Sequence, residues 1–459
     1  MSRASVSSLL VALLGLSACG GSSLPSASRG TSVAPSRSVL PSASAAGATW
    51  EADVARLQAD LETVQQIADD NDGIRAVGTP GFDASVDAML TELDEIGFAT
   101  RTEEVPYTGF RENSASLTVG GRTFAAPDEL HALIYSASGD VRGTVAVLHR
   151  SGCDPGDFAN VADGAIAMTT EGGCFRRDQA INAAAAGAAA LVVGYPGRAR
   201  GEIYRPTLID PDGITIPVVS VTDEGVEALR AADGREARVE VVTERERKTL
   251  RNVIGEFGEG PAVLVLGGHL DSVLDGPGLN DNGSGVAALL EVARGIAEAG
   301  VPDGWTVRIG LWGGEEFGDL GSRAHVARTP DGIEAYLNLD MAGSLHGAAL
   351  VYDEAAAPSG SEHITELYEA ALAARGADST RVDIGGSSDH FAFSQAGIPI
   401  GGLFAGAGEA GSAAQPSAAT GQMADDCYHL ACDDIDNVDV ERVALFAEAT
   451  FDVAYALMR

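Results

Sequence analysis

The sequence predicts an α/β protein, a three-layer α/β/α domain whose mixed, mostly parallel sheet is interrupted by a β-rich segment. After residue 249, strand-like runs alternate with helical patterns, as in parallel sheets covered by helices on both faces. Polar motifs stand directly after several of these strands, where the active sites of such sheets lie. Over residues 113–246, short strand-like runs mark the interrupting segment. The 459 residues suffice for about two or three domains.

The N-terminal segment has the pattern of an export signal over residues 1–18, with Arg3 ahead of a short apolar run at 9–16. The run is too short to span a bilayer. It ends in LSAC, which resembles a bacterial lipobox and implies that Cys19 carries lipid; a plain secretory signal with an incidental cysteine is the alternative. Residues 19–48 are rich in Ser, Ala, Gly and Pro and predict a disordered tether. We therefore expect a protein anchored to the outer face of a bacterial cell membrane, or released from the cell.

Two amphipathic helices are predicted next, because apolar residues recur at helical spacing over 50–67 and over 82–96. Gly97 stands at a natural C-cap of the second helix. Residues 101–107 then alternate like a strand. Further strands are predicted at 145–148, 165–168, 190–193, 252–257, 262–267, 307–311 and 336–339, and further helices at 286–299, 361–375 and 441–456.

The net charge of −36 argues against a nucleic-acid partner, because phosphate backbones require clustered Lys and Arg. A charge of this size is typical of a heavily hydrated surface. No segment after the export signal is long and apolar enough to span a membrane, so membrane contact is expected only through a lipid anchor. We expect a monomer.

Four cysteines remain if Cys19 carries lipid, and they form two pairs that are close in sequence. Because an exported protein folds in an oxidising compartment, an even set favours disulfides. The predicted pairs are Cys153–Cys174 and Cys427–Cys432. Zinc bound by cysteines is the alternative, but no compact Cys-x-x-Cys pair occurs.

Two candidate metal-binding motifs follow the strand at 262–267. His269 can bind a metal, and Asp271, two residues on, can orient the ligands from behind. Asp281 lies on a Gly-rich turn that opens a helix, and its two oxygens could bridge two cations. A structural histidine and a helix cap are the alternatives for these two motifs.

Three more motifs complete the candidate site. Glu315 and Glu316 are adjacent in an apolar, Gly-rich run, where burial is costly without a positive partner. Asp340 ends a buried strand, and His429 lies in the loop that the second predicted disulfide would close. Together the motifs offer two histidines, three carboxylate ligands and one spare Glu, which is the set of ligands that a two-zinc site with open positions uses.

These motifs resemble, in order, those of the exported bizinc aminopeptidases of the streptomycete leucine aminopeptidase type. The similarity covers about residues 50–110 and 250–459, and it rests on HLDSV, GLNDNGSG, WGGEEFG, NLDM, SSDHFAF, GIPIGGLF and CYHLACD. The resemblance implies two zinc ions per chain. It implies that His269 and Asp340 hold one zinc, that Glu316 and His429 hold the other, and that Asp281 bridges them.

The same resemblance implies roles for the remaining site residues. Glu315 matches the general base, Asp271 the residue behind the first histidine, and Tyr428 a hydroxyl that steadies the tetrahedral intermediate. The wall of the pocket for the N-terminal side chain matches Met341, Gly386 and Phe404.

One departure from the family concerns the Ser-Asp-His run. Some streptomycete members have Arg immediately before it, whereas Ser387 stands there in this chain. Any substrate contact that this Arg makes is therefore absent. Ser388, Asp389 and His390 match the run itself, and we place His390 behind the ligands because the ligand set is already complete.

The interrupting segment resembles the protease-associated domain, a module inserted in many exported peptidases. The resemblance rests on residues 171–195 and 216–229, and it implies a lid or a wall for substrate access; a generic βα unit is the alternative. The predicted domains are thus a signal peptide at 1–18, a tether at 19–48, a zinc aminopeptidase domain at 49–112 and 247–459, and a protease-associated domain at 113–246.

The predicted function is hydrolysis of the N-terminal bond of peptides with a free N-terminus, with large apolar N-terminal residues preferred. Glu315 would activate a water between two zincs. A related zinc carboxypeptidase or glutaminyl cyclase is one alternative, although basic residues are scarce near the motifs. A binding protein that has lost catalysis is another, although all ligands are present. No G-x-S-x-G motif indicates a serine hydrolase.

Overall fold

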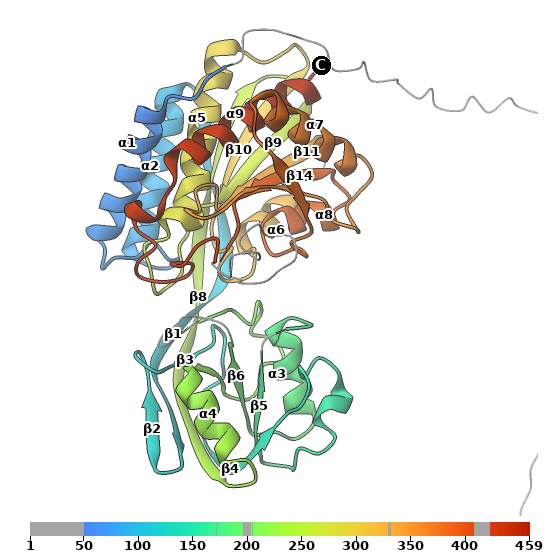
Figure 1. The fold of residues 1–459 in the computed structure, drawn as a ribbon. Helices are drawn as coiled ribbons and strands as arrows, with labels where there is room; N and C mark the ends of the chain where they lie inside the picture. Colours follow the sequence, from blue (N-terminus) through green and yellow to red (C-terminus); the bar gives the residue numbers. More distant parts are fainter. Residues whose placement is uncertain (1–49, 171, 196–202, 204, 329–331, 408–422) are drawn as a thin grey trace, which may run out of the picture. The chain divides into compact units, whose positions relative to one another are not determined.

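The computed structural model describes residues 50–459 apart from 171, 196–202, 204, 329–331 and 408–422 (Figure 1). The predicted signal peptide, the tether and Cys19 lie outside the described residues. Within the described part of the chain, every helix is too short or too polar to cross a membrane.

The central sheet has a parallel core, as the alternating pattern predicts (Figure 1). Its neighbouring parallel strands, in spatial order, are β14 (Ile400–Phe404), β11 (Ile333–Asp340), β9 (Ala262–His269) and β10 (Trp305–Trp312). Antiparallel strands flank this core, which makes the sheet mixed. They are β8 (Glu236–Gly258) beside β10, and β12 (Ala349–Tyr352) beside β14, with β13 (Ser379–Val382) parallel to β12 at the edge.

Helices cover this sheet on both faces. Alternate residues of β9 belong to two different apolar clusters, and each cluster contains residues of helices. Leu264 and Leu266 belong to the cluster that includes α5 (Gly285–Ala299). Val263 and Val265 belong to a second cluster that includes Phe393 of α8 (His390–Gln395). The remaining helices of the first layer are α1 (Val54–Asp69), α2 (Pro80–Ile96), α7 (Ser361–Ala374) and α9 (Val440–Leu457), and α6 (Leu320–Arg328) joins α8 in the second layer. The predicted three-layer α/β/α class is confirmed.

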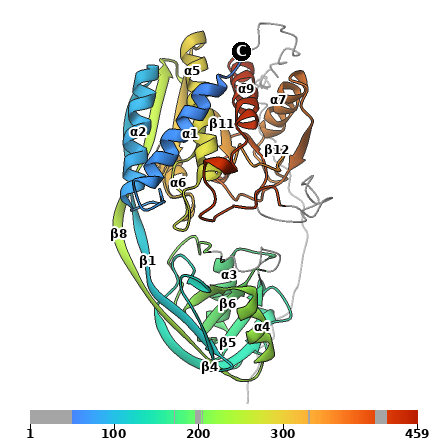
Figure 2. The ribbon, with the colours of Figure 1, turned by 60° about the vertical axis from the view of Figure 1, so that its left-hand side comes forward.

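Two long strands connect this sheet to the inserted segment. β1 (Ala99–Val119) pairs antiparallel with β8 over most of its length, with a register shift between Glu112 and Ser114 (Figure 2). The sequence predicted only short strands here. The segment between them holds a smaller sheet of β4 (Gly139–Val147), β5 (Ile166–Thr170), β6 (Ala190–Gly194), β7 (Val218–Val221) and β3 (Leu130–Ala132), with α3 (Arg176–Ala185) and α4 (Asp223–Ala231).

The C-cap of α2 and the two disulfides agree with the sequence-based predictions. Gly97 caps α2 with a φ of 108°, a left-handed conformation that suits glycine. Both predicted disulfides, Cys153–Cys174 and Cys427–Cys432, are present. The expected domain boundaries at 112/113 and 246/247 fall inside β1 and β8, so the division into domains stays a prediction.

Candidate active site

The polar motifs meet at one edge of the central sheet, because parallel strands end at the same edge. His269 ends β9 and Asp340 ends β11, while Glu315 and Glu316 follow β10. Asp281 lies in the turn that precedes α5. His429 comes from the loop that the Cys427–Cys432 disulfide closes.

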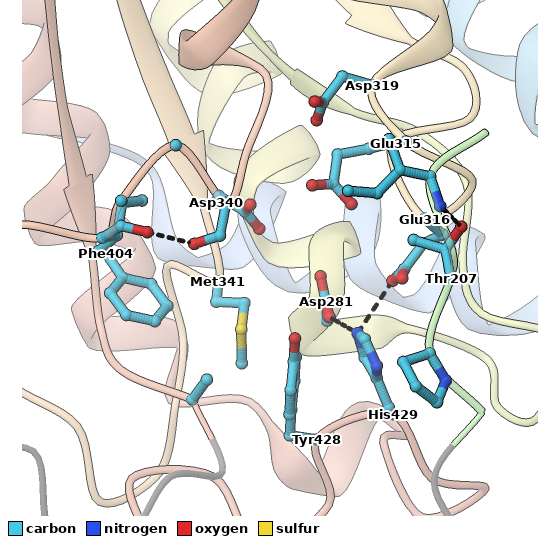
Figure 3. A pocket seen from close by; sticks show the side chains of 18 of the residues that line it. Thr207, Asp281, Glu315, Glu316, Asp319, Asp340, Met341, Phe404, Tyr428 and His429 are labelled. Carbon is cyan, nitrogen blue, oxygen red and sulfur yellow. Dashed lines mark hydrogen bonds and ion pairs between the residues drawn. The ribbon is translucent and has the colours of Figure 1, made fainter. Parts of the chain in front are cut away.

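Asp281 is the centre of the site, because its two carboxylate oxygens face two different histidines. Its Oδ1 lies 3.0 Å from Nε2 of His269, and its Oδ2 lies 2.9 Å from Nε2 of His429. A further carboxylate approaches each histidine. Asp340 Oδ1 lies 3.3 Å from Nε2 of His269. Glu316 Oε1 lies 3.2 Å from Nε2 of His429 (Figure 3).

The hydrogen bonding of His269 identifies which ring nitrogen is available to bind a metal ion. Its Nδ1 donates to the backbone carbonyl of Asp271 at 3.0 Å, so Nε2 of the neutral ring carries a lone pair. Because Nε2 faces oxygens of Asp281 and Asp340, it must carry either a proton or a bound cation there. One imidazole with two carboxylates is a set of ligands that zinc accepts.

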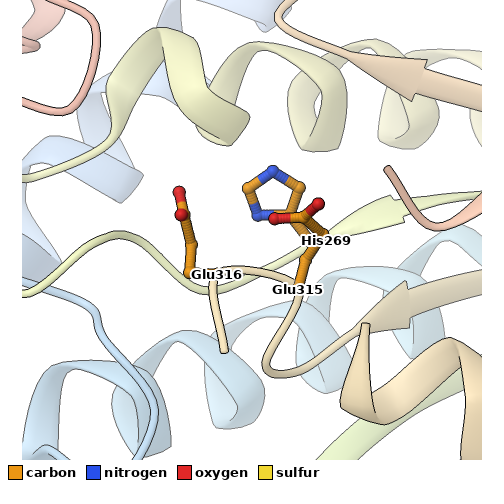
Figure 4. Close-up of side chains that lie close together, drawn as sticks. All are labelled: His269, Glu315 and Glu316. Atoms are coloured by element: carbon orange, nitrogen blue, oxygen red, sulfur yellow. The ribbon is translucent and has the colours of Figure 1, made fainter. Parts of the chain in front are cut away.

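Among the residues that the structure describes, three groups of side chains could hold a metal ion, with ligand atoms within 4.8 Å of one another. One group combines His269 with Asp281 and Asp340, and a second combines His429 with Asp281 and Glu316. The third contains His269, Glu315 and Glu316, and Figure 4 shows the Glu315 carboxylate beside the His269 ring. Asp281 therefore belongs to two sites, and Glu315 lies next to both.

Burial and charge shift the pKa values of these groups in opposite directions. Burial would lower the pKa of His269, but the negative charge of Asp340 and the hydrogen bond with Asp281 raise it well above its usual value. Burial would raise the pKa of Asp281, but the two histidines lower it. Burial raises the pKa of Glu315 well above its usual value. Burial thus favours the neutral form of each group, whereas the contacts between the histidines and the carboxylates favour their charged forms.

Asp271 connects the His269 loop with the two glutamates. Its Oδ1 accepts hydrogen bonds from the backbone N–H groups of Gly314, at 2.8 Å, and of Glu315, at 3.2 Å. The same oxygen is 3.9 Å from Nδ1 of His269, so the backbone carbonyl of Asp271, rather than its carboxylate, is the acceptor for the histidine. Asp271 thus binds His269 through its backbone carbonyl and the backbone of Glu315 through its carboxylate.

The Ser-Asp-His run also lies behind the ligands. Ser388 donates a hydrogen bond of 2.7 Å from Oγ to Oδ2 of Asp340. His390 pairs through Nε2 with Glu354, on the side of β12, rather than with the residues around Asp281. Ser387 donates to the carbonyl of Ile384.

Two of the predicted site residues adopt backbone conformations that side chains usually avoid. Met341 has a φ of 49° and His429 a φ of 63°. A positive φ costs a non-glycine residue free energy, and such residues concentrate at functional sites. In both cases the strained residue presents its side chain to the pocket beside Asp281.

A pocket of about 570 Å³ opens onto the carboxylates. Met341, Gly386 and Phe404, the three residues expected to line it, do line it. The rings of Tyr428 and His429 have centroids 3.8 Å apart and are tilted by 31°, and the Tyr428 hydroxyl points toward Asp281 (Figure 3). The inserted segment also contributes to the lining, with Phe175, Thr207 and Ile209 among others.

Two positions that the sequence analysis did not single out hold the loops of the site. Asn282 accepts hydrogen bonds from the backbone N–H groups of Gly285 and Met341, and it donates to the carbonyl of Leu339. The fully buried guanidinium of Arg75 donates to three backbone carbonyls, of Leu270, Pro277 and Gly278. The GLNDNGSG motif contains Asn282, but no local pattern marks Arg75, which is distant in sequence.

Comparison with known proteins agrees with this geometry. A model of peptidase family M28 matches residues 252–454, and a model of the PA domain matches residues 135–229. An aminopeptidase of Pseudomonas aeruginosa is 36% identical over 420 residues, which are 85% of this chain and 78% of that protein. This chain belongs to peptidase family M28. The resemblance to zinc aminopeptidases with a protease-associated domain is thereby confirmed.

Two further similarities place this M28 chain among aminopeptidases. A probable lipoprotein aminopeptidase of Mycobacterium tuberculosis, LpqL, is 35% identical over 429 residues, which are 87% of this chain and 83% of that protein. Among solved structures, a zinc aminopeptidase of Bacillus subtilis superposes with a TM-score of 0.67 at 26% identity, covering 87% of this chain and 94% of that chain.

Proposed function

We propose that this M28 chain is an exported aminopeptidase that uses two zinc ions to hydrolyse the N-terminal bond of peptides. That it is a zinc-dependent aminopeptidase follows from its family and its relatives. The observation that carries the two-ion site is the position of Asp281, whose two oxygens lie 3.0 Å and 2.9 Å from two different histidines. Bridging of this kind is typical of two-metal hydrolases.

The ligand assignment follows these contacts. His269 and Asp340 would hold one zinc, and Glu316 and His429 the other, with Asp281 shared between them. The ions, when bound, would lower the pKa of a water between them and polarise the peptide carbonyl.

The residues of the chain supply the rest of the mechanism. Glu315 accepts the proton of the attacking water and passes it to the leaving amine, because its carboxylate lies beside the site without being needed as a ligand. Tyr428 donates a hydrogen bond to the oxygen on which negative charge develops. Asp271 holds the backbone of Glu315 and so fixes where the base stands.

We expect large apolar N-terminal residues to be cleaved fastest, because Met341 and Phe404 present apolar side chains to the pocket. In a panel of aminoacyl chromogenic substrates, Leu, Met and Phe should give higher kcat/KM than Glu or Gly, and a chelator should abolish all cleavage. An acetylated N-terminus should stop cleavage, whereas an amidated C-terminus should not. Faster hydrolysis of the acetylated peptide than of the free amine would exclude an aminopeptidase, and a requirement for a free C-terminus would indicate a carboxypeptidase.

The inserted segment is proposed to be a protease-associated domain over residues 113–246 that forms part of the pocket wall. Phe175, Thr207 and Ile209 support this role because they line the same pocket as Glu315 and Met341. A wall of this kind would limit how the peptide beyond its first residue enters the site.

A lipid anchor on Cys19 is proposed from the lipobox pattern, and the lipoprotein among the relatives supports it. Cys19→Ser should move the protein from the membrane fraction to the soluble extracellular fraction, because one cysteine carries the acyl chains. Ser28→Ala, in the predicted tether, is the matched control and should remain membrane-associated. If the Cys19→Ser protein stays with the membranes as the control does, the anchor is not at Cys19.

A further inference from the structure

We propose that Asp433 is a positioning residue that holds the turn of Asp281 in register with the loop of His429. Asp433 is the last residue of the CYHLACD motif and is 1% exposed, but the proposed mechanism gives it no role. The inference rests on the proposed function, because it concerns the geometry of the shared carboxylate.

The carboxylate of Asp433 binds the backbone of the Asp281 turn directly. Its Oδ1 accepts the N–H of Asn280 at 2.9 Å, and its Oδ2 accepts the N–H of Asp281 at 3.1 Å. The backbone carbonyl of Asp433 also accepts the N–H of Leu279 at 2.9 Å. Three consecutive N–H groups of the turn are therefore held by one residue, and the last of them belongs to Asp281 itself.

A second buried carboxylate holds the same turn from the other end of the disulfide loop. Asp425 accepts the side-chain amide of Asn280 at 2.6 Å and the backbone N–H of Cys427 at 2.8 Å. Asn437 joins the two carboxylates, because its Nδ2 donates to Asp425 at 3.0 Å and to Asp433 at 2.9 Å. The loop that carries Tyr428 and His429 is thus fastened to the turn at both of its ends.

Arg75 binds the carbonyl groups of the same segment. Its guanidinium donates to the carbonyls of Pro277 and Gly278, just before the N–H groups that Asp433 accepts, and to the carbonyl of Leu270 next to His269. A guanidinium on the carbonyls and a carboxyl group on the N–H groups fix the turn from two sides. The turn cannot then rotate without breaking charge-assisted hydrogen bonds.

This arrangement matters for metal binding because Asp281 faces both histidines within about 3 Å. A small rotation of its backbone would misdirect both oxygens at once. Asp433→Asn would make such a rotation favourable, because the amide keeps one acceptor oxygen but turns an NH₂ group toward one of the two N–H donors. We therefore expect both zinc sites to weaken together.

The test compares Asp433→Asn with Asp436→Asn, the same chemical change at an exposed position three residues away. Zinc affinity of the metal-free proteins is measured by competition with a chromophoric chelator, together with kcat at saturating zinc and the thermal midpoint of the metal-free form. We expect the zinc affinity of Asp433→Asn to fall about 10–100-fold, a loss that is typical of residues supporting metal ligands, and kcat to fall as well. Asp425→Asn should show a smaller change in the same direction, and it replaces Asp433→Asn if that variant does not fold.

The outcomes separate this inference from the proposed function. If wild type binds two zincs and cleaves free N-termini, but the folded variants match Asp436→Asn within about threefold in zinc affinity and kcat, Asp433 is only structural and the inference is wrong. A lower thermal midpoint with unchanged zinc affinity would also overturn the inference. Failure of the wild-type protein to bind zinc or to cleave any free N-terminus would instead overturn the proposed function.

Discussion

Replacing Glu315 with glutamine is expected to lower kcat about 10²–10⁴-fold while leaving the zinc content unchanged. Glu315 lies beside His269, but the other two groups of ligands each contain three donors without it. The amide has nearly the same shape as the carboxylate, so it preserves the packing but cannot accept a proton. The measurement is kcat on a leucyl substrate alongside elemental analysis of the purified variant.

The neighbouring glutamate provides the matched comparison. Glu316→Gln should weaken or lose one zinc, because Glu316 lies 3.2 Å from Nε2 of His429 as a ligand would. If Glu315→Gln loses zinc and Glu316→Gln keeps it, the two roles are reversed. A Glu315→Gln variant with nearly normal kcat would show that another group takes the proton, and the mechanism would be wrong.

Asp281→Ala is expected to remove both zincs and all measurable activity. It is the one carboxylate common to the two groups around His269 and His429, so its loss leaves each ion with one imidazole and one carboxylate. Elemental analysis should give two zincs per chain for the wild type and none for the variant after dialysis against a weak chelator.

A single-site ligand variant is the control for this result. Asp340→Ala removes a ligand of only one group, so one zinc should remain under the same dialysis. Retention of two zincs by Asp281→Ala would contradict the shared role of Asp281. A wild-type protein that holds a single zinc after supplementation would contradict the two-ion site.

Much of the fold could be predicted because the relevant interactions are local. The apolar spacing and Gly97 identify α2, which ends where the left-handed cap requires it. The disulfides were predictable because each joins cysteines that are close in sequence. The full lengths of β1 and β8 were not predictable, because much of their sequence is polar and they pair with each other although the inserted segment separates them in sequence.

The candidate ligands of the site could be identified from the amino-acid sequence. They are two histidines and the carboxylates, which stand at the ends of predicted strands or close after them. A histidine or an aspartate that follows a parallel strand lies at the carboxyl edge of the sheet, whatever the order of the strands. The family resemblance added which residue plays which role, and the structure brings these residues together around Asp281.

How these residues are held, and what surrounds them, became visible only in three dimensions. Asp433 ends the CYHLACD motif, but the motif does not show that its side chain binds the backbone of Asp281. Arg75 lies far from Asp281 in sequence, and a lone buried Arg has no periodic or turn pattern that would distinguish it from a surface residue. The same applies to Thr207, which reaches the pocket from the inserted segment. Such contacts depend on long-range packing of loops, whereas local sequence patterns report only helices, strands, caps and turns.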